Sequence, residues 1–258
     1  MHIQELFDLT NKTAIITGGG RGLGEQMAKA FAEAGANVVL CSRKLEACQA
    51  VSKELESLGV KTLALKCDIT DPDDIQHVVD KTIERFGSID VLVNNSGATW
   101  GTPAVDMPLE AWKKVIDVNV TGTFLMSQAV GKVMMSQKSG KIINIASVAG
   151  LGGTDPKVMD TIGYNTSKGA VITLTKDLAV KWGEYNINVN ALAPGFFPTK
   201  MSKGVLEHGG ESILERTPLG RFGNEDDLKG AALFLASRAA DFTTGNVLVV
   251  DGGTHALV

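Results

Sequence analysis

The sequence predicts one doubly wound α/β domain over residues 1–258, with a seven-stranded parallel sheet. Seven short apolar runs recur along the chain, each bounded by Gly, Asn, Asp or Lys. Their continuous apolar character is typical of parallel strands that helices cover on both faces. Helical patterns alternate with these runs, which places a ligand site at the carboxyl ends of the strands. The strand candidates are TAIITG, NVVLCS, KTLALKC, DVLVNN, KIINIAS, INVNALA and NVLVVDG.

The first strand candidate runs into a glycine-rich turn, TGGGRGLG, and a helix follows it. Glycine lets the backbone approach a pyrophosphate, and the helix start offers unpaired N–H groups and a positive dipole end to the anion. The turn does not fit the G-x-G-x-x-G fingerprint in any register. A plain tight turn is the alternative, but its place after the first strand favours a phosphate site formed by Gly18, Arg21, Gly22, Leu23 and Gly24.

The end of the second strand candidate indicates which dinucleotide binds. NAD sites place a carboxylate about 20 residues after the glycine motif, whereas this strand ends in LCSRK, without an acid. The hydroxyl of Ser42 and the guanidinium of Arg43 suit a 2'-phosphate, and Arg21 is within reach of the same group. We therefore predict NADP(H) as the cofactor. The alternative is that Arg43 and Lys44 only begin a solvated helix.

The later elements carry two further features. Helical patterns at 45–59 and 72–87 separate the next strands, and each pattern ends in glycine. In the helical pattern at 162–182, Tyr164 and Lys168 share one face, as a reactive pair or as a snorkelling lysine beside a partly buried tyrosine. The long interruption from Pro194 to Gly223 is a candidate substrate lid over residues 196–222, or a plain surface excursion.

Composition and charge argue against several function classes. A net charge of −4, a pI near 5.6 and the lack of a dense Lys/Arg block disfavour a nucleic-acid partner. The apolar runs are too short to cross a bilayer and the N-terminus lacks a secretory pattern, so a cytoplasmic protein without a membrane partner is predicted. Cys41, Cys48 and Cys67 lack metal-ligand spacing, which predicts buried reduced thiols and no metal site.

Seven pieces in order make the chain resemble the short-chain dehydrogenase/reductase family from Asn11 to Gly253: TGGGRGLG, CDITD, NNSG, DVNVTG, INIAS, YNTSK and PG. The resemblance implies a Rossmann-type fold, a homo-oligomer, often a tetramer, and hydride exchange between a nicotinamide and a carbonyl or alcohol. It makes Asp68 and Ile69 the adenine-contacting pair and Asn94 the residue that steadies the central strand. It also implies that the cofactor contacts Asn95, Gly97, Tyr164, Lys168, Pro194, Gly195, Phe197 and Thr199.

The same resemblance makes Asn119, Ser147, Tyr164 and Lys168 the catalytic group. A tyrosine with the reference pKa near 10 is a poor base at neutral pH. The positive charges of Lys168 and of the oxidised nicotinamide are expected to favour the phenolate, so that Tyr164 takes or returns the alcohol proton. Ser147 is expected to donate to the substrate oxygen. By resemblance, Lys168 also bonds the nicotinamide ribose and Asn119 holds a relay water.

Two positions depart from the family pattern. Ser96 stands where the family more often has Ala, and Tyr164 follows Ser147 by 17 positions, several more than usual. The additional segment contains Asp155 and Pro156 in a predicted extended loop beside the pocket. It therefore bears on substrate shape and not on the chemistry.

The pocket wall is predicted to be mostly apolar, which suits an aliphatic or aromatic ketone or a β-ketoacyl chain better than a polyol. The leading prediction is an NADP(H)-dependent carbonyl or β-ketoacyl reductase acting on a ketone or secondary alcohol. A sugar-acid dehydrogenase such as gluconate 5-dehydrogenase is the alternative enzyme. A nucleotide-sensing binding protein is the alternative from another class, which the intact Tyr164 and Lys168 disfavour. The wall residues, or core residues in the other interpretation, are Trp100, Met107, Leu151, Met159, Phe196, Phe197 and Met201.

Overall fold

The strand order of the sheet determines where a ligand-binding crevice can form. The computed structural model describes residues 1–257 and confirms a parallel seven-stranded sheet in the order β3-β2-β1-β4-β5-β6-β7. The order reverses between β1 and β4, and such a switch point leaves a crevice at the carboxyl ends of the strands. The strands are β1 Thr13–Thr17, β2 Asn37–Ser42, β3 Thr62–Lys66, β4 Val91–Asn94, β5 Gly140–Ile145, β6 Ile187–Pro194 and β7 Val247–Val250.

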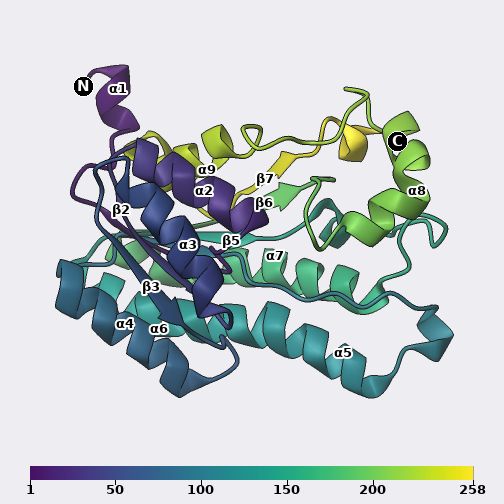
Figure 1. The fold of residues 1–258 in the computed structure, drawn as a ribbon, viewed down its shortest axis with the longest axis horizontal. Coiled ribbons are helices and arrows are strands. Elements are labelled where there is room, and N and C mark those ends of the chain that lie inside the picture. The colour runs from purple at the N-terminus through teal and green to yellow at the C-terminus, as the bar shows by residue number, and fades with distance from the viewer. Residues whose placement is uncertain (258) are drawn as a thin grey trace.

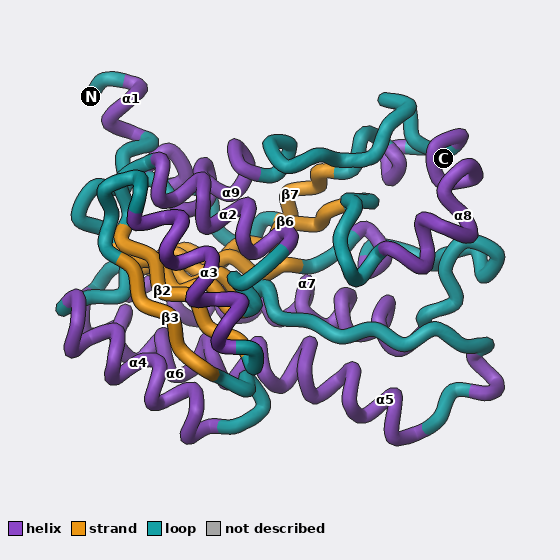
Figure 2. The backbone as a smooth tube through the Cα atoms, in the orientation of Figure 1, coloured by secondary structure: helices purple, strands orange, loops and turns teal. Residues whose placement is uncertain are grey.

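Helices cover both faces of the sheet (Figures 1 and 2). Helices α2, α3 and α9 lie on one face, α4 to α7 lie on the other, and α8 lies apart from both layers (Figure 1). The three-layer arrangement confirms the doubly wound fold. The helices are α1 Ile3–Leu6, α2 Gly22–Glu33, α3 Leu45–Glu56, α4 Pro72–Phe86, α5 Leu109–Ile116, α6 Gly122–Gln137, α7 Ile162–Trp182, α8 Lys203–Glu215 and α9 Lys229–Ala236.

Helix α4 shows how the local sequence sets an element. Asp71 caps its start by accepting a hydrogen bond from the Asp73 N–H, and Pro72 occupies the first turn, where its missing N–H costs nothing. Gly87 ends the helix with φ +80°, a conformation that a side chain disfavours. Ile75, Val78 and Val79 are buried, so the predicted apolar stripe does face the sheet.

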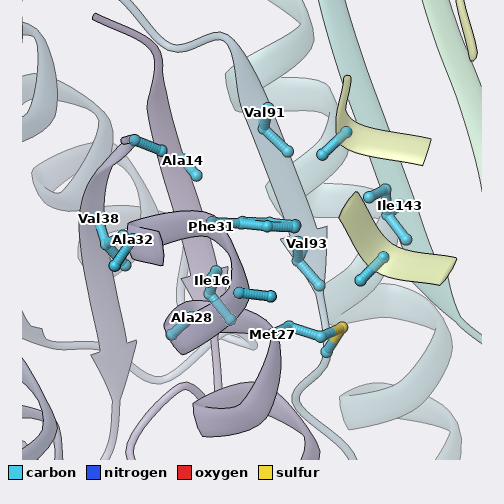
Figure 3. Close-up of a cluster of buried hydrophobic side chains, with 14 of the residues drawn as sticks. Ala14, Ile16, Met27, Ala28, Phe31, Ala32, Val38, Val91, Val93 and Ile143 are labelled. Carbon is cyan, nitrogen blue, oxygen red and sulfur yellow. The ribbon is translucent and has the colours of Figure 1, made fainter. Parts of the chain in front are cut away.

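The core between α2 and the sheet holds the glycine-rich turn in place. Phe31 of α2 is fully buried, and Figure 3 shows its ring reaching toward Val91 and Val93 of β4. Burial of a side chain of this size contributes about 1.5–3 kcal/mol. Because α2 begins at Gly22, this packing fixes the turn that precedes the helix over the crevice.

The structure differs from the sequence-based expectations in two places. The interruption from Pro194 to Gly223 contains helix α8. Adjacent glycines at 209 and 210 and a single buried residue, Ile213, leave α8 without the apolar periodicity by which a helix is recognised. The second difference is a π-helical segment, Asp117–Thr121, between α5 and α6, which carries Asn119.

Two compositional predictions also have a structural outcome. Cys41, Cys48 and Cys67 are free and buried, as predicted. Among the described helices, none combines the length and apolarity that crossing a membrane requires.

Candidate active site

A cleft of about 1190 Å³ opens at the carboxyl ends of the strands. It brings together most of the residues predicted from the sequence, although these come from segments far apart in the chain. Gly24 and Asn119 lie outside its wall. The predicted residues that line it are Gly18, Arg21, Gly22, Leu23, Ser42, Arg43, Asp68, Ile69, Asn95, Gly97, Ser147, Tyr164, Lys168, Pro194, Gly195, Phe197 and Thr199.

The glycine-rich turn forms one end of the cleft. Gly18 and Gly22 have φ values of +64° and +57°, which L side chains rarely adopt. A Cβ on Gly20 would lie 2.9 Å from the backbone of Ala47, so this glycine allows the turn to pack against α3. The N-cap residue of α2, Arg21, makes no side-chain capping bond, which leaves the helix N–H groups free for an anion.

Hydrogen bonds join the turn to the end of β4. Asn95 Nδ2 donates to the carbonyl oxygens of Thr17 and Gly18 at 3.0 and 3.2 Å. The Thr17 hydroxyl oxygen accepts from the N–H groups of Asn95 and Ser96, both at 3.0 Å. A Cβ on Gly24 would lie 2.5 Å from Asn95 Nδ2, so Gly24 supports the turn from behind although it is not in the wall.

The end of β2 presents cations to the cleft. Ser42 Oγ accepts from the Lys44 N–H at 3.2 Å, an Asx-like turn that starts α3, and Arg43 is exposed beside it. Burial raises the pKa of Asp68, but hydrogen bonds from Thr70 and the charge of Arg43 outweigh burial and lower that pKa. The charge of Arg43 therefore acts on Asp68, and both residues lie in the cleft wall.

Tyr164 and Ser147 meet at the other end of the cleft. A short helical turn, Val148–Gly150, follows Ser147, and its Gly150 packs so closely on α7 that a Cβ would lie 2.6 Å from the carbonyl carbon of Lys168. Burial raises the pKa of the Tyr164 phenol, and a hydrogen bond with Ser147 lowers it by less. The Ser147 oxygen accepts from the Ala149 N–H at 3.2 Å, so its own proton is the one that can point to the Tyr164 oxygen.

Lys168 is 5% exposed, and its ammonium lies inside the protein. Its Nζ donates to the carbonyl oxygen of Ile145 at 2.6 Å and lies 5.5 Å from the centroid of the Tyr164 ring. Burial lowers the pKa of Lys168 to about 8. Burial of the Tyr164 phenol outweighs the hydrogen bond that stabilises its anion, and Lys168 is not among the groups that shift this pKa. The lowering expected from Lys168 together with the oxidised nicotinamide stays a prediction for the site with its cofactor.

The Asn119 side chain lies behind the cleft and bonds two segments of the chain to each other. Its Oδ1 accepts from the Ala98 N–H at 2.7 Å, and its Nδ2 donates to the Ala98 carbonyl at 2.9 Å and to Ser167 Oγ at 2.8 Å. Ser167 Oγ in turn donates to the Tyr164 carbonyl at 2.7 Å. Asn119 thus joins the segment after β4 to the helical turn that carries Tyr164 and Lys168.

A similar network explains the placement of Asn94. Its Nδ2 donates to Ser127 Oγ and to Asn144 Oδ1, each at 2.9 Å. These contacts join β4 to α6 and β5, whereas the Asn94 Oδ1 has no partner among the described residues. The amide therefore connects three elements behind the cleft.

The predicted substrate wall is only partly formed by the expected side chains. Met159, Phe196, Phe197 and Met201 line the cleft. Trp100 is 46% exposed and outside the wall. Met107 packs against Gly163, and Leu151 packs against a core cluster under β5 and β6, so these two residues are structural.

Two residues of the site, one behind the cleft and one in its wall, were missed by sequence reasoning. Ser167 lies inside the YNTSK motif, but its link to Asn119 spans 48 positions and left no local signal. Arg216 lines the cleft and contacts Asp155 across 61 positions. Its sequence surroundings, LERTPLG, contain no pattern that indicates a binding site.

Comparison with known proteins agrees with this geometry. The family model described as enoyl-(acyl carrier protein) reductase matches residues 18–255. A 2-dehydro-3-deoxy-D-gluconate 5-dehydrogenase of Pseudoalteromonas atlantica is 40% identical and covers 96% of this chain and 98% of its own. A 3-oxoacyl-[acyl-carrier-protein] reductase of Synechocystis is 39% identical and covers 95% of this chain and 97% of its own.

A solved structure matches over the full length of both chains. It is a gluconate 5-dehydrogenase from Burkholderia cenocepacia in complex with NADP and tartrate, with a TM-score of 0.94, 36% identity and 100% coverage of each chain. Sequence and structure thus agree over nearly the whole molecule and not only at the motifs. The chain belongs to the short-chain dehydrogenase/reductase family of oxidoreductases.

Proposed function

We propose that this oxidoreductase transfers hydride between NADP(H) and a ketone or secondary alcohol, with Tyr164 as the proton-transfer residue. The observation that carries the proposal is the meeting of Ser147, Tyr164 and buried Lys168 in one cleft with the glycine-rich turn. A proton donor and an oxygen-binding hydroxyl beside a nucleotide cradle are what reversible carbonyl reduction requires. The 3-oxoacyl-[acyl-carrier-protein] reductase among the relatives supports the ketone class.

The cleft fits a phosphate-bearing dinucleotide. The uncapped start of α2 and the positive-φ glycines of the turn leave N–H groups and space for a pyrophosphate. Arg43 would bind the 2'-phosphate and Lys168 the nicotinamide ribose. When bound, the nicotinamide supplies or accepts the hydride. The NADP in the Burkholderia relative supports this assignment.

The protein's own groups handle the proton and the carbonyl oxygen. Because burial raises the pKa of Tyr164, the phenol is protonated near neutral pH and ready to donate to a ketone oxygen. The Ser147 hydroxyl would redirect its proton from Tyr164 to the same ketone oxygen as negative charge develops there. In oxidation, Tyr164 takes the alcohol proton back, so the oxidative reaction is expected to gain from higher pH.

Tyr164→Phe tests this function directly. It removes the transferable proton and keeps the ring, so kcat for a ketone should fall about 10²- to 10⁴-fold while NADPH binding survives. Tyr185→Phe is the matched control, because Tyr185 is the other tyrosine of the chain and packs against a core cluster away from the cleft. NADPH oxidation followed at 340 nm, with NADH in place of NADPH as a second arm, measures both the role of Tyr164 and the cofactor preference. Unchanged turnover in Tyr164→Phe refutes the assignment.

A second candidate function is a sugar-acid dehydrogenase. The observation that favours it is Arg216, a cation in the cleft wall, together with relatives named for gluconate derivatives. Both candidates use the same proton chemistry and differ in the groups that the substrate carries around the reacting carbonyl. A nucleotide-sensing protein without catalysis would instead bind NADPH and turn over no ketone.

The homotetramer and the cytoplasmic location belong to the same proposal. Several large apolar side chains are exposed on the layer formed by α5, α6 and α7, which supports association. Three free thiols, all buried, agree with a reducing compartment.

A further inference from the structure

We infer that Arg216 anchors a carboxylate of the substrate, so that this cleft selects keto and hydroxy acids over neutral ketones. The inference rests on the proposed function and names the substrate class of the same site. It comes from the segment between Ser147 and Tyr164, whose additional length the proton chemistry does not explain. Three observations carry it: the place of Arg216, its incomplete pairing and the apolar wall around it.

Arg216 follows helix α8 and reaches the segment before α7. Its Nη2 lies 3.3 Å from Asp155 Oδ2. Among residues 1–257, no other ion pair joins the stretch 203–216 to the rest of the chain. A Cβ on Gly209 of α8 would lie 3.7 Å from Val158, so helix and segment face each other here. The two side chains thus meet between α8 and the catalytic helix, and both line the cleft.

The Asp155 end of this contact is held close to Tyr164. The Asp155 carbonyl accepts from the Val158 and Met159 N–H groups, both at 2.9 Å, which folds the segment into a turn. The preceding Thr154 accepts from Asn165 Nδ2 at 2.8 Å, and Asn165 follows Tyr164 in α7. A carboxylate bound by Arg216 is therefore held on the Tyr164 side of the cleft, opposite the glycine-rich turn.

The pairing of Arg216 is incomplete. It makes one contact with Asp155, at 3.3 Å, and its side chain is 57% exposed. Arg221 shows what a complete pair looks like in the same chain, because its two Nη atoms bond the two oxygens of Asp227 at 2.5 and 2.8 Å. Within the described part of the chain, the one side-chain contact of Arg216 uses Nη2, so its Nη1 and Nε donors are available for a second carboxylate.

The surrounding wall makes this cation selective. Val158, Met159, Phe196, Val205 and Ile213 line the cleft and carry no charge, although Lys200 in the same wall is a second cation. Asp155 is the acid in contact with it, so a substrate carboxylate is attracted by Arg216 and repelled by Asp155. Removing the Asp155 charge should therefore strengthen the binding of a substrate carboxylate. That result would distinguish carboxylate binding by Arg216 from an ion pair that only holds α8 against the segment before α7.

The test compares 5-keto-D-gluconate with the ketohexose that carries a hydroxymethyl group in place of its carboxylate. Arg216→Gln should lower kcat/KM for the keto acid about 10- to 100-fold, mostly through KM, and change the neutral ketose less than about twofold. Arg216→Lys should retain part of the wild-type kcat/KM for the keto acid, because the positive charge remains although the planar, two-donor guanidinium is lost. Asp155→Asn should lower KM for the keto acid, because it removes the charge that repels the substrate carboxylate. The amide keeps the oxygen that accepts from the Lys157 N–H at 3.0 Å, so the segment should retain its fold.

The matched control is Arg238→Gln. Arg238 is 59% exposed and pairs with Asp241, much as Arg216 pairs with Asp155, but it does not line the cleft. It should leave kinetics with both substrates unchanged. Calorimetric titration of the protein with NADP⁺ and D-gluconate gives a second readout that needs no turnover, and Arg216→Gln should abolish the binding that Tyr164→Phe retains.

Several outcomes overturn the inference. Equal losses of Arg216→Gln on both substrates, or a rise of KM in Asp155→Asn that matches Arg216→Gln, would show that the pair only holds α8 in place. Wild-type protein that neither binds D-gluconate nor reduces 5-keto-D-gluconate also overturns it. If that protein still reduces a neutral ketone with NADPH, the proposed function stands while this inference fails; if it reduces no ketone at all, both fail.

Discussion

Lys168 carries a charge whose burial lowers the stability of the folded protein. Its pKa falls from the ordinary 10.5 to about 8, because burial penalises the ammonium. That shift corresponds to about 3 kcal/mol of unfavourable burial at neutral pH, partly offset by the hydrogen bond to Ile145. A charge held inside the protein at such a cost is typical of a functional position.

Lys168→Met should therefore stabilise the protein and inactivate it. Without the buried charge, the free energy of unfolding at pH 7 should rise by about 2 kcal/mol, or about 4–8 °C in Tm. Between pH 8 and 10.5 the unfolded chain holds a proton that the folded Lys168 has released, so wild-type stability rises with pH in this window and the advantage of the variant shrinks. Denaturant unfolding at pH 7 and pH 10 measures the difference.

The control for this prediction is Lys176→Met, on the same helix at an exposed position. It should change stability by less than about 0.5 kcal/mol at either pH. A Lys168→Met protein that is less stable than wild type at pH 7 would show that the lysine contributes packing or bonding that outweighs its burial.

Residues in local motifs were predictable from the sequence, and residues defined by distant partners were not. Tyr164 and Lys168 share a helix face through spacing alone, so their proximity follows from helix geometry. Ser167 acquires its role from Asn119, and Arg216 acquires its role from Asp155, and neither partner is local. Composition around these residues carries no sign of such contacts.

At the scale of elements, apolar periodicity decided what was predictable. All seven strands were predicted, and so were helices α2, α3, α4 and α7, whereas α5 was not singled out. The strands were recognisable because burial on both faces imposes a continuous apolar run. Helix α8 was missed because it buries only Ile213. The π-helical segment at Asn119 was also missed, since its sequence fits an uninterrupted helix and the irregularity depends on tertiary contacts of the Asn119 side chain.

The weak burial of α8 leads to a prediction for the proposed lid at residues 196–222. Trypsin should cut this segment faster than the rest of the chain, because exposed sites such as Lys200 and Lys203 lie in a segment with little buried area. NADPH together with a ketone should slow these cuts about tenfold, if the segment closes over the substrate. Mass spectrometry of the early fragments identifies the sites.

Lys181, at the exposed end of α7, supplies the internal reference for that digestion. Its cutting rate should not depend on the ligands. A ligand-independent rate within 196–222 would leave α8 as a fixed part of the wall.

The whole molecule leaves apolar surface that one copy does not bury. On the layer of α5, α6 and α7, Leu109 is 63% exposed, Phe124 39% and Val180 84%. Side chains of this kind on neighbouring helices are typical of an interface between subunits. A homo-oligomer with closed symmetry would cover them, and the cleft lies at the carboxyl ends of the strands, so association through the helices leaves the cleft open.

Light scattering coupled to gel filtration should therefore give four copies of the 27.2 kDa chain, about 109 kDa. Phe124→Asp places a charge on the proposed interface and should shift the mass toward dimer or monomer, because an unpaired charge cannot be buried there without cost. Leu58→Asp is the matched control: Leu58 is 49% exposed next to α3, in the opposite helical layer, and its replacement should leave the mass unchanged. A wild-type mass near 27 kDa, or a tetramer indifferent to Phe124→Asp, would place the exposed apolar residues outside any subunit interface.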